Sequence, residues 1–522
     1  MELIDNKILK LRLRDTSTQL VKERIKRSEV ISRTEDGVNE VVVYWGLDEV
    51  TQLNDLLNLS KSLPSPISKE YKWAGLYEPF DHQRITSEFL SITRRGFCFN
   101  EAGTGKTSSA LWAADYLMNK GKVKRVLIIC PLSIMYSAWQ GDIFNTCMHR
   151  TSQVCHGSKE KRQLIINGDY EFIIINYDGV AIVKEDIKNA DFDLIIIDEA
   201  NAYKSTTTSR WKTLSKIVRP HTRIWMMTGT PASQSPEDAY GLAKLVCPER
   251  VPKFKTAWRD RVMYQVSRFR WLPRPTSKDE VFNALTPAIR FAKDECLDLP
   301  DVMYQTRDIK LTAQANKYYI QLKNQALIET AGEQISAVNA ASGMNKLLQI
   351  SGGAVYTDTK ETITFDIKPR LNALLEAVEE TSHKVLVFVP YRHTINIVSE
   401  FLSKNNIINE LIHGDVSARE RANIISRFQT AEDPRVLVIQ PQSASHGVTL
   451  TAANVVVFWS PVMSVEVYLQ CIARMDRVGQ KNKMTVVHLQ GSAVEKRMYA
   501  MLRGKVDQHT KLVDLYREVL EE

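Results

Sequence analysis

The chain has 522 residues and a net charge of +8, with 44% hydrophobic and 25% charged residues. One hydrophobic core cannot serve this length, so several domains are expected, and the composition is that of an ordinary soluble globular protein. The sequence shows no Cys-x-x-Cys pair typical of zinc sites, no signal-peptide pattern and no apolar run of the roughly 20 residues that span a bilayer. Seven scattered cysteines favour a reducing compartment, and the positive charge agrees only weakly with a polyanionic partner.

The first part of the chain, residues 1–75, is predicted to form a small α+β accessory module. Alternating apolar and basic residues at 8–14 predict a half-buried strand, and a second strand is expected at 38–45. Helices are expected at 18–27 and 47–59.

Two later regions alternate strands with helices. Their short apolar runs lack alternation, which is typical of parallel sheets buried on both faces. Residues 76–245 form the first region, with strands expected at 96–99, 125–130, 172–176, 194–197 and 224–228. Residues 366–492 form the second, with strands expected at 385–389, 410–412, 436–439, 455–459 and 484–489. We expect a helical and basic protrusion at 246–365 and a C-terminal helical brace at 493–522.

A glycine-rich turn follows the expected strand at 96–99 and precedes an expected helix at 108–118. Backbone N–H groups in such a turn, together with the helix dipole, bind phosphate oxygens. Asn100 stands where the first glycine of this motif belongs, and we expect it to take the left-handed backbone conformation. Lys106 is predicted to hold the β- and γ-phosphates and Thr107 to bind Mg²⁺. The predicted cradle comprises Gly103, Thr104, Gly105, Lys106 and Thr107.

Two adjacent carboxylates, Asp198 and Glu199, end the apolar strand expected at 194–197. Ligands of open α/β sheets bind at this end of the strands. We predict that Asp198 holds Mg²⁺ and that Glu199 orients and deprotonates an attacking water, as phosphoryl transfer to water requires. An acidic turn is a common alternative, but the phosphate cradle earlier in the chain favours catalysis.

A further cluster near the C-terminus combines Gln470, Arg474, Arg477 and Gln480. The spacing of the first three predicts a shared helical face, from which both arginines could point into a cleft. A guanidinium there would stabilise the charge of a γ-phosphate in the transition state. The alternative is a solvated basic face.

Together these motifs resemble the superfamily-two nucleic-acid motors, and within them the Swi/Snf-type translocases of double-stranded DNA, over residues 75–505. The stretch 101–107 is similar to that family's phosphate loop, Glu-Met-Gly-x-Gly-Lys-Thr. The ending Arg-x-x-Arg-x-Gly-Gln at 474–480 is the most specific match. The resemblance implies an α/β fold of two RecA-like parallel-sheet lobes with helical insertions, which bind ATP and Mg²⁺.

The same resemblance implies further nucleotide contacts. Phe80-Asp-His-Gln83 looks like the family's adenine-reading motif, with Gln83 as the reader. Glu101 and Gln470 belong to matched motifs and are added to the nucleotide site.

Contacts with nucleic acid are implied by three more matches. Cys130 to Ser133, followed by Trp139, looks like the family's first DNA-contact motif, and Thr228-Gly-Thr-Pro231 matches its coupling motif. Residues 443–447 stand in place of a glycine-rich loop but are degenerate. Arg392 follows the expected strand at 385–389 and could reach a phosphate, although a solvated loop is an equal alternative. The expected contacts are Ser133, Thr228, Thr230, Arg392 and Ser443.

Residues 228–237 also look like the annealing-helicase branch, in which a HARP-like domain before the motor helps to bind forked DNA. Residues 1–75 have a compatible size and order, and a plain accessory domain is an equal alternative. A basic and aromatic stretch at 250–274 could contact DNA through arginine and stacking side chains, or its aromatics could form a small core. Its cationic residues are Arg250, Lys253, Lys255, Arg259, Arg261, Arg268, Arg270 and Arg274, and its aromatic residues are Phe254, Trp258, Tyr264, Phe269 and Trp271.

The favoured hypothesis is an ATP-dependent translocase that tracks and remodels duplex or forked DNA, acting as a monomer without membrane contact. The alternative is a strand-separating helicase of the same superfamily on DNA or RNA. A third hypothesis, a DNA-binding scaffold with a vestigial nucleotide site, rests only on the degenerate loop at 443–447. We expect the protein in the cytoplasm of a bacterium or phage-infected cell, or in the nucleus of a eukaryote.

Overall fold

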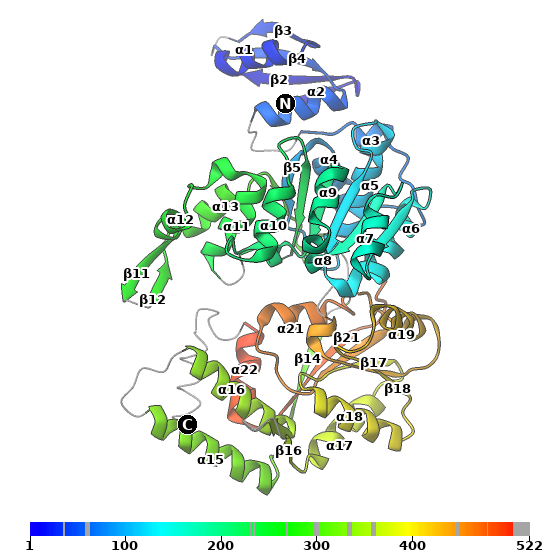
Figure 1. Cartoon of the computed structure of the whole chain (residues 1–522), viewed down its shortest axis with the longest axis vertical. Helices are drawn as coiled ribbons and strands as arrows, with labels where there is room; N and C mark the ends of the chain where they lie inside the picture. Colours follow the sequence, from blue (N-terminus) through cyan, green and yellow to red (C-terminus); the bar gives the residue numbers. More distant parts are fainter. Residues whose placement is uncertain are drawn as a thin grey trace. The chain divides into compact units, whose positions relative to one another are not determined.

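The computed structural model forms two compact units, Met1–Cys296 and Leu297–Glu522, each with its own parallel sheet and core (Figure 1). The structure describes residues 1–34, 37–57, 63–229, 231–232, 235–267, 270–296, 300, 302–330, 337–356, 362–444, 448–477 and 479–504. In the described part of the chain, no helix is long and apolar enough to cross a membrane.

Unit 1 begins with a four-stranded antiparallel sheet of order β1-β2-β4-β3. The predicted alternation is confirmed, because Leu9, Leu11 and Leu13 of β2 are buried while Ile8 and Arg12 are exposed. The strands are β1 (Glu2–Ile4), β2 (Ile8–Leu13), β3 (Ser28–Arg33) and β4 (Asn39–Tyr44), and the helices are α1 (Asp15–Arg24), α2 (Leu47–Leu56) and α3 (Ile67–Glu70).

This amino-terminal sheet shares one hydrophobic core with the rest of unit 1. The same cluster of buried side chains contains Leu9 and Val41 from the sheet and Leu90 and Leu111 from the helices beyond it. Two polar contacts reinforce the junction: the Trp45 indole N–H donates to the Pro64 carbonyl at 2.8 Å, and Lys122 pairs with Asp48 at 2.7 Å. The sheet is therefore built into unit 1.

The main sheet of unit 1 has seven parallel strands in the order β13-β5-β10-β9-β6-β8-β7. The five predicted strands are confirmed within a residue or two, and the structure adds β7 and β13 at the two edges. The strands are β5 (Arg95–Cys98), β6 (Val126–Cys130), β7 (Ser152–Cys155), β8 (Phe172–Asn176), β9 (Leu194–Asp198), β10 (Arg223–Met227) and β13 (Ala288–Ile289).

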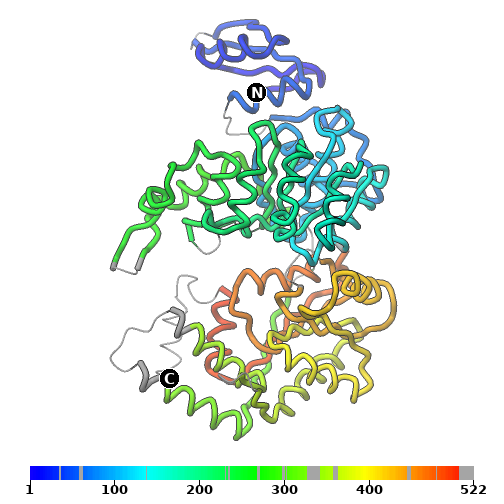
Figure 2. Tube along the Cα trace, in the orientation of Figure 1, coloured from blue at the N-terminus to red at the C-terminus, as the bar shows by residue number. Residues whose placement is uncertain are grey.

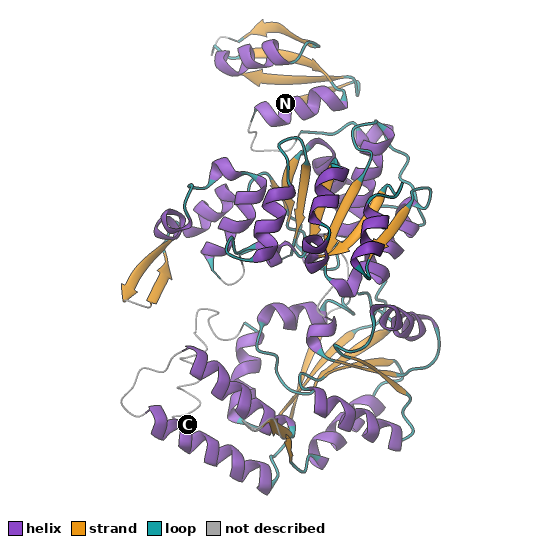
Figure 3. Ribbon diagram, viewed as in Figure 1, coloured by secondary structure: helices purple, strands orange, loops and turns teal. Residues whose placement is uncertain are grey.

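Helices cover both faces of this sheet (Figure 3). They are α4 (Asp81–Ile92), α5 (Lys106–Asn119), α6 (Gly141–Cys147), α7 (Lys159–Ile166), α8 (Tyr177–Ile182), α9 (Lys184–Ala190), α10 (Ser209–Ile217) and α11 (Ala239–Val246). Short 3₁₀ turns are η1 (Leu132–Ile134), η3 (Ala200–Tyr203), η4 (Pro236–Asp238) and η5 (Pro248–Arg250), and η2 (Met135–Gln140) is a π-helix.

A two-stranded hairpin projects from the helical end of unit 1 (Figure 2). It consists of β11 (Met263–Ser267) and β12 (Arg270–Pro273), and the flanking helices are α12 (Lys255–Val262), α13 (Ser277–Ala284) and α14 (Lys293–Cys296).

Unit 2 contains six parallel strands in the order β14-β21-β20-β17-β19-β18. They are β14 (Val302–Asp308), β17 (Lys384–Phe388), β18 (Asn409–Ile412), β19 (Val436–Ile439), β20 (Ala453–Phe458) and β21 (Met484–Gln490); a small hairpin pairs β15 (Ala354–Tyr356) with β16 (Thr362–Thr364). Its helices are α15 (Ala313–Thr330), α16 (Ala337–Gly352), α17 (Lys368–Glu379), α18 (Arg392–Lys404), α19 (Ala418–Thr430), α20 (Pro441–Ala444), α21 (Val465–Ile472) and α22 (Ala493–Leu502).

The predicted fold class, two α/β parallel-sheet lobes with helical insertions and a small α+β module, is confirmed. The predicted domain boundaries stay predictions. Two strands of the region predicted as a protrusion belong to the main sheets: β13 extends the sheet of unit 1 and β14 that of unit 2. Of the brace predicted at 493–522, α22 lies within the described residues and 505–522 lie outside them.

Candidate nucleotide-binding site and nucleic-acid contacts

Several predicted site residues of unit 1 follow neighbouring strands. The phosphate loop follows β5, Thr228 follows β10, and Asp198 ends β9, and these three strands are adjacent in the order β5-β10-β9. Because the strands are parallel, all three segments meet at the carboxyl edge of the sheet, where ligands bind in open α/β folds. The fold therefore brings together residues more than 90 positions apart.

The phosphate loop has the backbone geometry that an anion requires. Gly103 and Gly105 have φ angles of 90° and 78°, which favour glycine, and Gly105 caps the 14-residue helix α5. A Cβ atom at Gly105 would lie 2.0 Å from the Gln83 amide nitrogen, so the Gln83 side chain would have to move for a larger residue. Thr104 is fully buried, and its hydroxyl donates to the Glu101 carbonyl at 2.8 Å. The helix N-terminus and this loop fit phosphate oxygens.

Lys106 and Thr107 open α5 in the positions predicted for them. The Lys106 ammonium donates to the carbonyls of Asn100 at 2.7 Å and Glu101 at 3.0 Å. A cation held by carbonyls at the mouth of the loop is suited to move onto a phosphate. Thr107 follows it on the first turn of α5, where a hydroxyl can bind Mg²⁺.

Asn100 does not take the left-handed conformation, so this part of the prediction is wrong. Asn100 is fully buried, and its amide bridges two other segments. Its nitrogen donates to the Thr86 hydroxyl at 2.8 Å, and its oxygen accepts from the Phe291 N–H at 3.1 Å. The side chain, rather than the backbone, explains why asparagine suits this position.

Gln83 lies against the phosphate loop. Its oxygen accepts from the Phe80 N–H at 3.0 Å in a capping box that starts α4, and its nitrogen donates to the Thr104 carbonyl at 3.2 Å. His82 contacts the same carbonyl at 2.9 Å. Reading of adenine by Gln83 stays a prediction, and in this structure its amide supports the loop.

The end of β9, which carries both carboxylates, is held in place by aromatic donors. Asp198 is 9% exposed, and one oxygen accepts from the Trp139 indole N–H at 3.0 Å while the other accepts from the Glu199 N–H at 2.9 Å. Glu199 has a φ angle of 48°. The Tyr177 hydroxyl donates to the Asp198 carbonyl at 2.7 Å, and burial next to both carboxylates raises the Tyr177 pKa far above its usual range. Tyr177 therefore stays protonated and donates.

Trp139 follows a stretch that resembles a DNA-contact motif, but its ring is fully buried and its N–H is bound to Asp198. Sequence reasoning missed both aromatic supports. A signal existed for Tyr177, because it directly follows β8 and so lies at the carboxyl edge of the sheet.

In unit 2, the shared helical face predicted for the arginine motif is wrong, because α21 ends at Ile472 and the following residues form turns. Arg474 is 1% exposed, and its guanidinium donates to the carbonyls of Gln470 at 2.7 Å and Val448 at 3.2 Å. Arg477 is half-buried and donates to the Thr449 hydroxyl at 3.1 Å. Arg474 therefore fixes the turn from inside the core, whereas Arg477 reaches the surface.

The glutamines of the same motif differ in their surroundings. Gln470 is half-buried and donates to Glu466 at 3.3 Å. Gln480 is buried and donates to the Ala453 carbonyl at 2.8 Å, which ties the turn to β20. Gln480 is thus a structural residue of unit 2.

The residues predicted to contact nucleic acid lie on different elements and differ in how exposed they are. Ser133 is half-buried in η1 after β6, and the exposed Arg392 begins α18, where it pairs with Asp415. Ser443 lies in α20 after β19 and is 8% exposed. Thr228 is fully buried in this structure, and its contact with DNA stays a prediction. Thr230 and residues 445–447 lie outside the described residues.

The basic and aromatic stretch divides between core and surface. Trp258 is fully buried and belongs to a core cluster of unit 1, and Arg259 lies 4.2 Å above the Trp271 ring. Phe254 and Tyr264 are exposed. The core interpretation holds for Trp258, and DNA contact by the exposed residues stays a prediction. Arg268 and Phe269 lie outside the described part of the chain.

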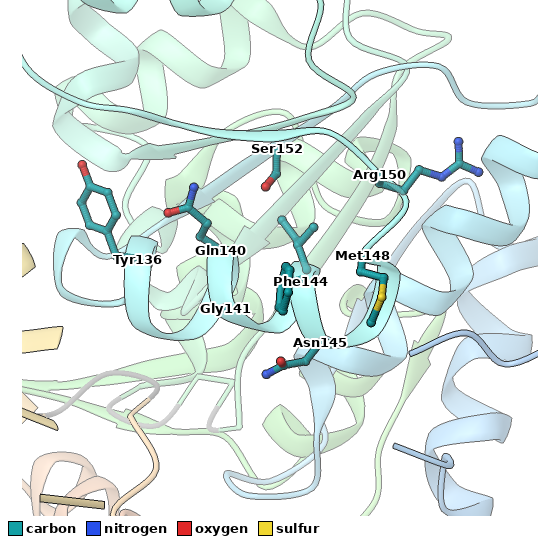
Figure 4. Close-up of a pocket in the computed structure, with 9 residues that line it drawn as sticks. Tyr136, Gln140, Gly141, Phe144, Asn145, Met148, Arg150 and Ser152 are labelled. Carbon is teal, nitrogen blue, oxygen red and sulfur yellow. The ribbon is translucent and has the colours of Figure 1, made fainter. Parts of the chain in front are cut away.

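A separate pocket of about 460 Å³ lies between η2, α6 and the edge strand β7 (Figure 4). Phe144 and Met148 project from α6 at its rim and are largely exposed. None of the predicted nucleotide or nucleic-acid residues lines it.

Comparison with known proteins identifies two family domains. The SNF2-related domain matches residues 43–352, and the helicase conserved C-terminal domain matches residues 369–479. Protein p41 of Acyrthosiphon pisum secondary endosymbiont phage 1 is 26% identical over 76% of this chain and 88% of its own length. The human DNA annealing helicase and endonuclease ZRANB3 is 24% identical over 86% of this chain.

The chain spans 42% of the length of ZRANB3. A solved Sulfolobus solfataricus SWI2/SNF2 ATPase core in complex with double-stranded DNA aligns with 86% of this chain and 97% of its own at 19% identity and a TM-score of 0.41. The SNF2-related match covers more than half of the 522 residues. The chain therefore belongs to the SNF2-related family of helicase-type, DNA-dependent ATPases.

Proposed function

We propose that this protein is an ATP-driven translocase that tracks along duplex or forked DNA and remodels it, working as a monomer. The observation that supports this most strongly is the placement of Lys106, Asp198 and Glu199 at the ends of strands in one parallel sheet. Family membership supplies the DNA-dependent ATPase activity, and the proposal concerns which DNA is used and how.

Hydrolysis would use the residues of unit 1 in defined roles. The loop N–H groups and Lys106 bind the triphosphate, and Thr107 with Asp198 would hold Mg²⁺, which neutralises charge on the phosphates when bound. Glu199 orients the attacking water and accepts its proton. Trp139 and Tyr177 fix the strand end that carries both acids.

Coupling would require unit 2. We assign contact with the γ-phosphate during turnover to Arg477, which reaches the surface of its unit, and a positioning role to the buried Arg474. Gln470 would help to complete the nucleotide site. A contact that forms with ATP and breaks after hydrolysis would let the two units grip one DNA strand alternately.

Contacts with DNA would come from both units. Ser133 in unit 1, and Arg392 and Ser443 in unit 2, each follow the carboxyl end of a strand in their own sheet. The exposed Phe254 and Tyr264 near the β11–β12 hairpin would add contacts to unpaired bases at a fork. ZRANB3 is named a DNA annealing helicase, which supports annealing of forked strands as the result of translocation. The amino-terminal sheet would then serve as an accessory DNA-binding element.

The test is a steady-state ATPase titration with duplex, single-stranded and forked DNA and with RNA, beside strand-displacement and triplex-disruption assays. The proposal expects stimulation by duplex and forked DNA, and triplex disruption without strand displacement. Stimulation by single strands or RNA with displacement would replace it by the strand-separating helicase. No stimulation by any nucleic acid would refute it. Acting on DNA, the protein is expected in the cytoplasm of a bacterium or phage-infected cell, or in the nucleus of a eukaryote.

A further inference from the structure

The last segment of unit 1, residues 287–296, is paired with the phosphate loop; we refer to it as the connector. Backbone N–H groups of Phe97, Phe99 and Glu101 donate to the carbonyls of Pro287, Ile289 and Phe291 at 3.0, 2.8 and 3.1 Å. The ladder that joins β5 to β13 thus continues past the end of β5 into the loop that is to hold phosphate.

Two side chains of the loop extend this attachment. The Asn100 amide oxygen accepts from the Phe291 N–H at 3.1 Å, and the Glu101 carboxylate accepts from the Lys293 N–H at 3.2 Å. Arg290 adds an ion pair with Glu101 at 3.7 Å, which is exposed enough to contribute little. Both N–H donors are backbone groups, so these hydrogen bonds fix the position of the connector's main chain.

The same two loop residues hold the phosphate-binding lysine. The Lys106 ammonium donates to the carbonyls of Asn100 and Glu101, so each of these residues faces Lys106 with its backbone and the connector with its side chain. When Lys106 turns to a phosphate, both carbonyls lose a cationic donor. A shift of the loop would then act directly on the hydrogen bonds to Phe291 and Lys293.

We propose that Asn100 and Glu101 are positioning residues that transmit occupancy of the phosphate site to the connector, the segment of unit 1 that precedes unit 2 in the chain. This inference rests on the proposed role of Lys106 in binding phosphate. It explains why the loop carries a buried asparagine where glycine would suffice for the turn. Substituting a residue of this kind is expected to change the free energy that couples the nucleotide site to a second binding site.

Amide hydrogen exchange tests, in the absence of DNA, whether the connector responds to nucleotide. In the full chain, Mg·AMP-PNP is expected to slow exchange of the Phe291 and Lys293 amides at least about threefold, because nucleotide orders the loop that accepts from them. In Asn100→Gly the Phe291 amide is expected to exchange faster and to lose its response to nucleotide. Protection of the Gly103 and Gly105 amides by nucleotide, with no change at Phe291 and Lys293, would overturn the inference.

A matched pair of substitutions tests the consequence for coupling. Lys293 is the first residue of α14, a position where proline is tolerated, so Lys293→Pro removes the N–H that Glu101 accepts while Lys293→Ala retains it. Both variants lose the same ammonium group. We expect DNA stimulation of ATPase activity to fall about five- to tenfold in Lys293→Pro and to stay near the wild-type value in Lys293→Ala.

Equal stimulation in the two variants would overturn the coupling role. If the wild-type ATPase is not stimulated by DNA, the proposed function fails, and the exchange experiment still decides whether the loop and the connector respond together. If DNA stimulates hydrolysis but the amides are silent, the proposed function stands and this inference alone is lost.

Discussion

Replacing Trp139 by phenylalanine should weaken the use of Mg²⁺ rather than the binding of DNA. Trp139 is fully buried, and its indole N–H is the donor to the outer oxygen of Asp198, the expected metal ligand, at 3.0 Å. Phenylalanine fills much of the ring volume but removes this donor. The opposite oxygen of Asp198 keeps its bond from the Glu199 N–H at 2.9 Å, so the carboxylate loses one of its hydrogen bonds.

The magnitude follows from the kind of bond that is lost. A buried hydrogen bond to a charged group contributes about 1.5–3 kcal/mol, which corresponds to roughly 10- to 150-fold in an equilibrium constant. Loss of groups that orient metal ligands typically costs about 10- to 100-fold in affinity or activity. We therefore expect the Mg²⁺ concentration for half-maximal ATPase activity to rise by at least about tenfold.

The assay is steady-state ATPase activity at saturating ATP and DNA over a range of Mg²⁺ concentrations, with DNA affinity measured by fluorescence anisotropy. Trp112→Phe is the matched control, because Trp112 is also buried in unit 1 and its indole N–H donates to the Ala74 carbonyl at 2.8 Å, away from the carboxylates. Both variants should lose similar stability. An unchanged Mg²⁺ requirement in Trp139→Phe, or a loss of DNA affinity in its place, would refute the reasoning.

Three further predictions concern catalysis, coupling and pH. Glu199→Gln should retain ATP and DNA binding but lose at least about 100-fold in turnover, because the base is gone; a rate near wild type would reject this role. Arg477→Ala should retain nucleotide affinity and lose about 10³-fold in DNA-stimulated hydrolysis, and an unchanged ATPase titration would count against it. Burial and the nearby Arg503 lower the pKa of His488 to about 3, so unit 2 should be fully stable above pH 6.5 and lose stability as the pH falls towards 3. At pH 5 this group should cost about 2 kcal/mol relative to pH 8; thermal unfolding of His488→Phe, which lacks the group, should show a smaller acid effect, and an identical pH profile would contradict the assignment.

The sequence predicted those features that are encoded locally. Fully buried strands such as β6 and β9 are short apolar runs, and the phosphate loop carries its glycines at the positions where φ is positive. The residues at the carboxyl edge of unit 1 could be grouped correctly because parallel strands bring their ends together.

Features that depend on distant parts of the chain could not be predicted. The edge strand β14 is largely exposed, so it lacks the apolar run of a central strand. The partner that selects Asn100 is the Phe291 N–H, 191 residues later. The burial of Trp139 and Arg474 likewise follows from tertiary contacts, to Asp198 and Val448, that no local pattern reveals.

The amino-terminal sheet shows how far the ATPase machinery extends in this chain. Its apolar residues belong to the same packed cluster as those of α4, the helix that carries Gln83, and α5, the helix that carries Lys106. A version of the motor trimmed to its recognisable motifs would expose that side of α4 to water. The first 57 residues are therefore part of the foundation of the catalytic unit, and their sequence is constrained by the nucleotide site as well as by whatever they bind.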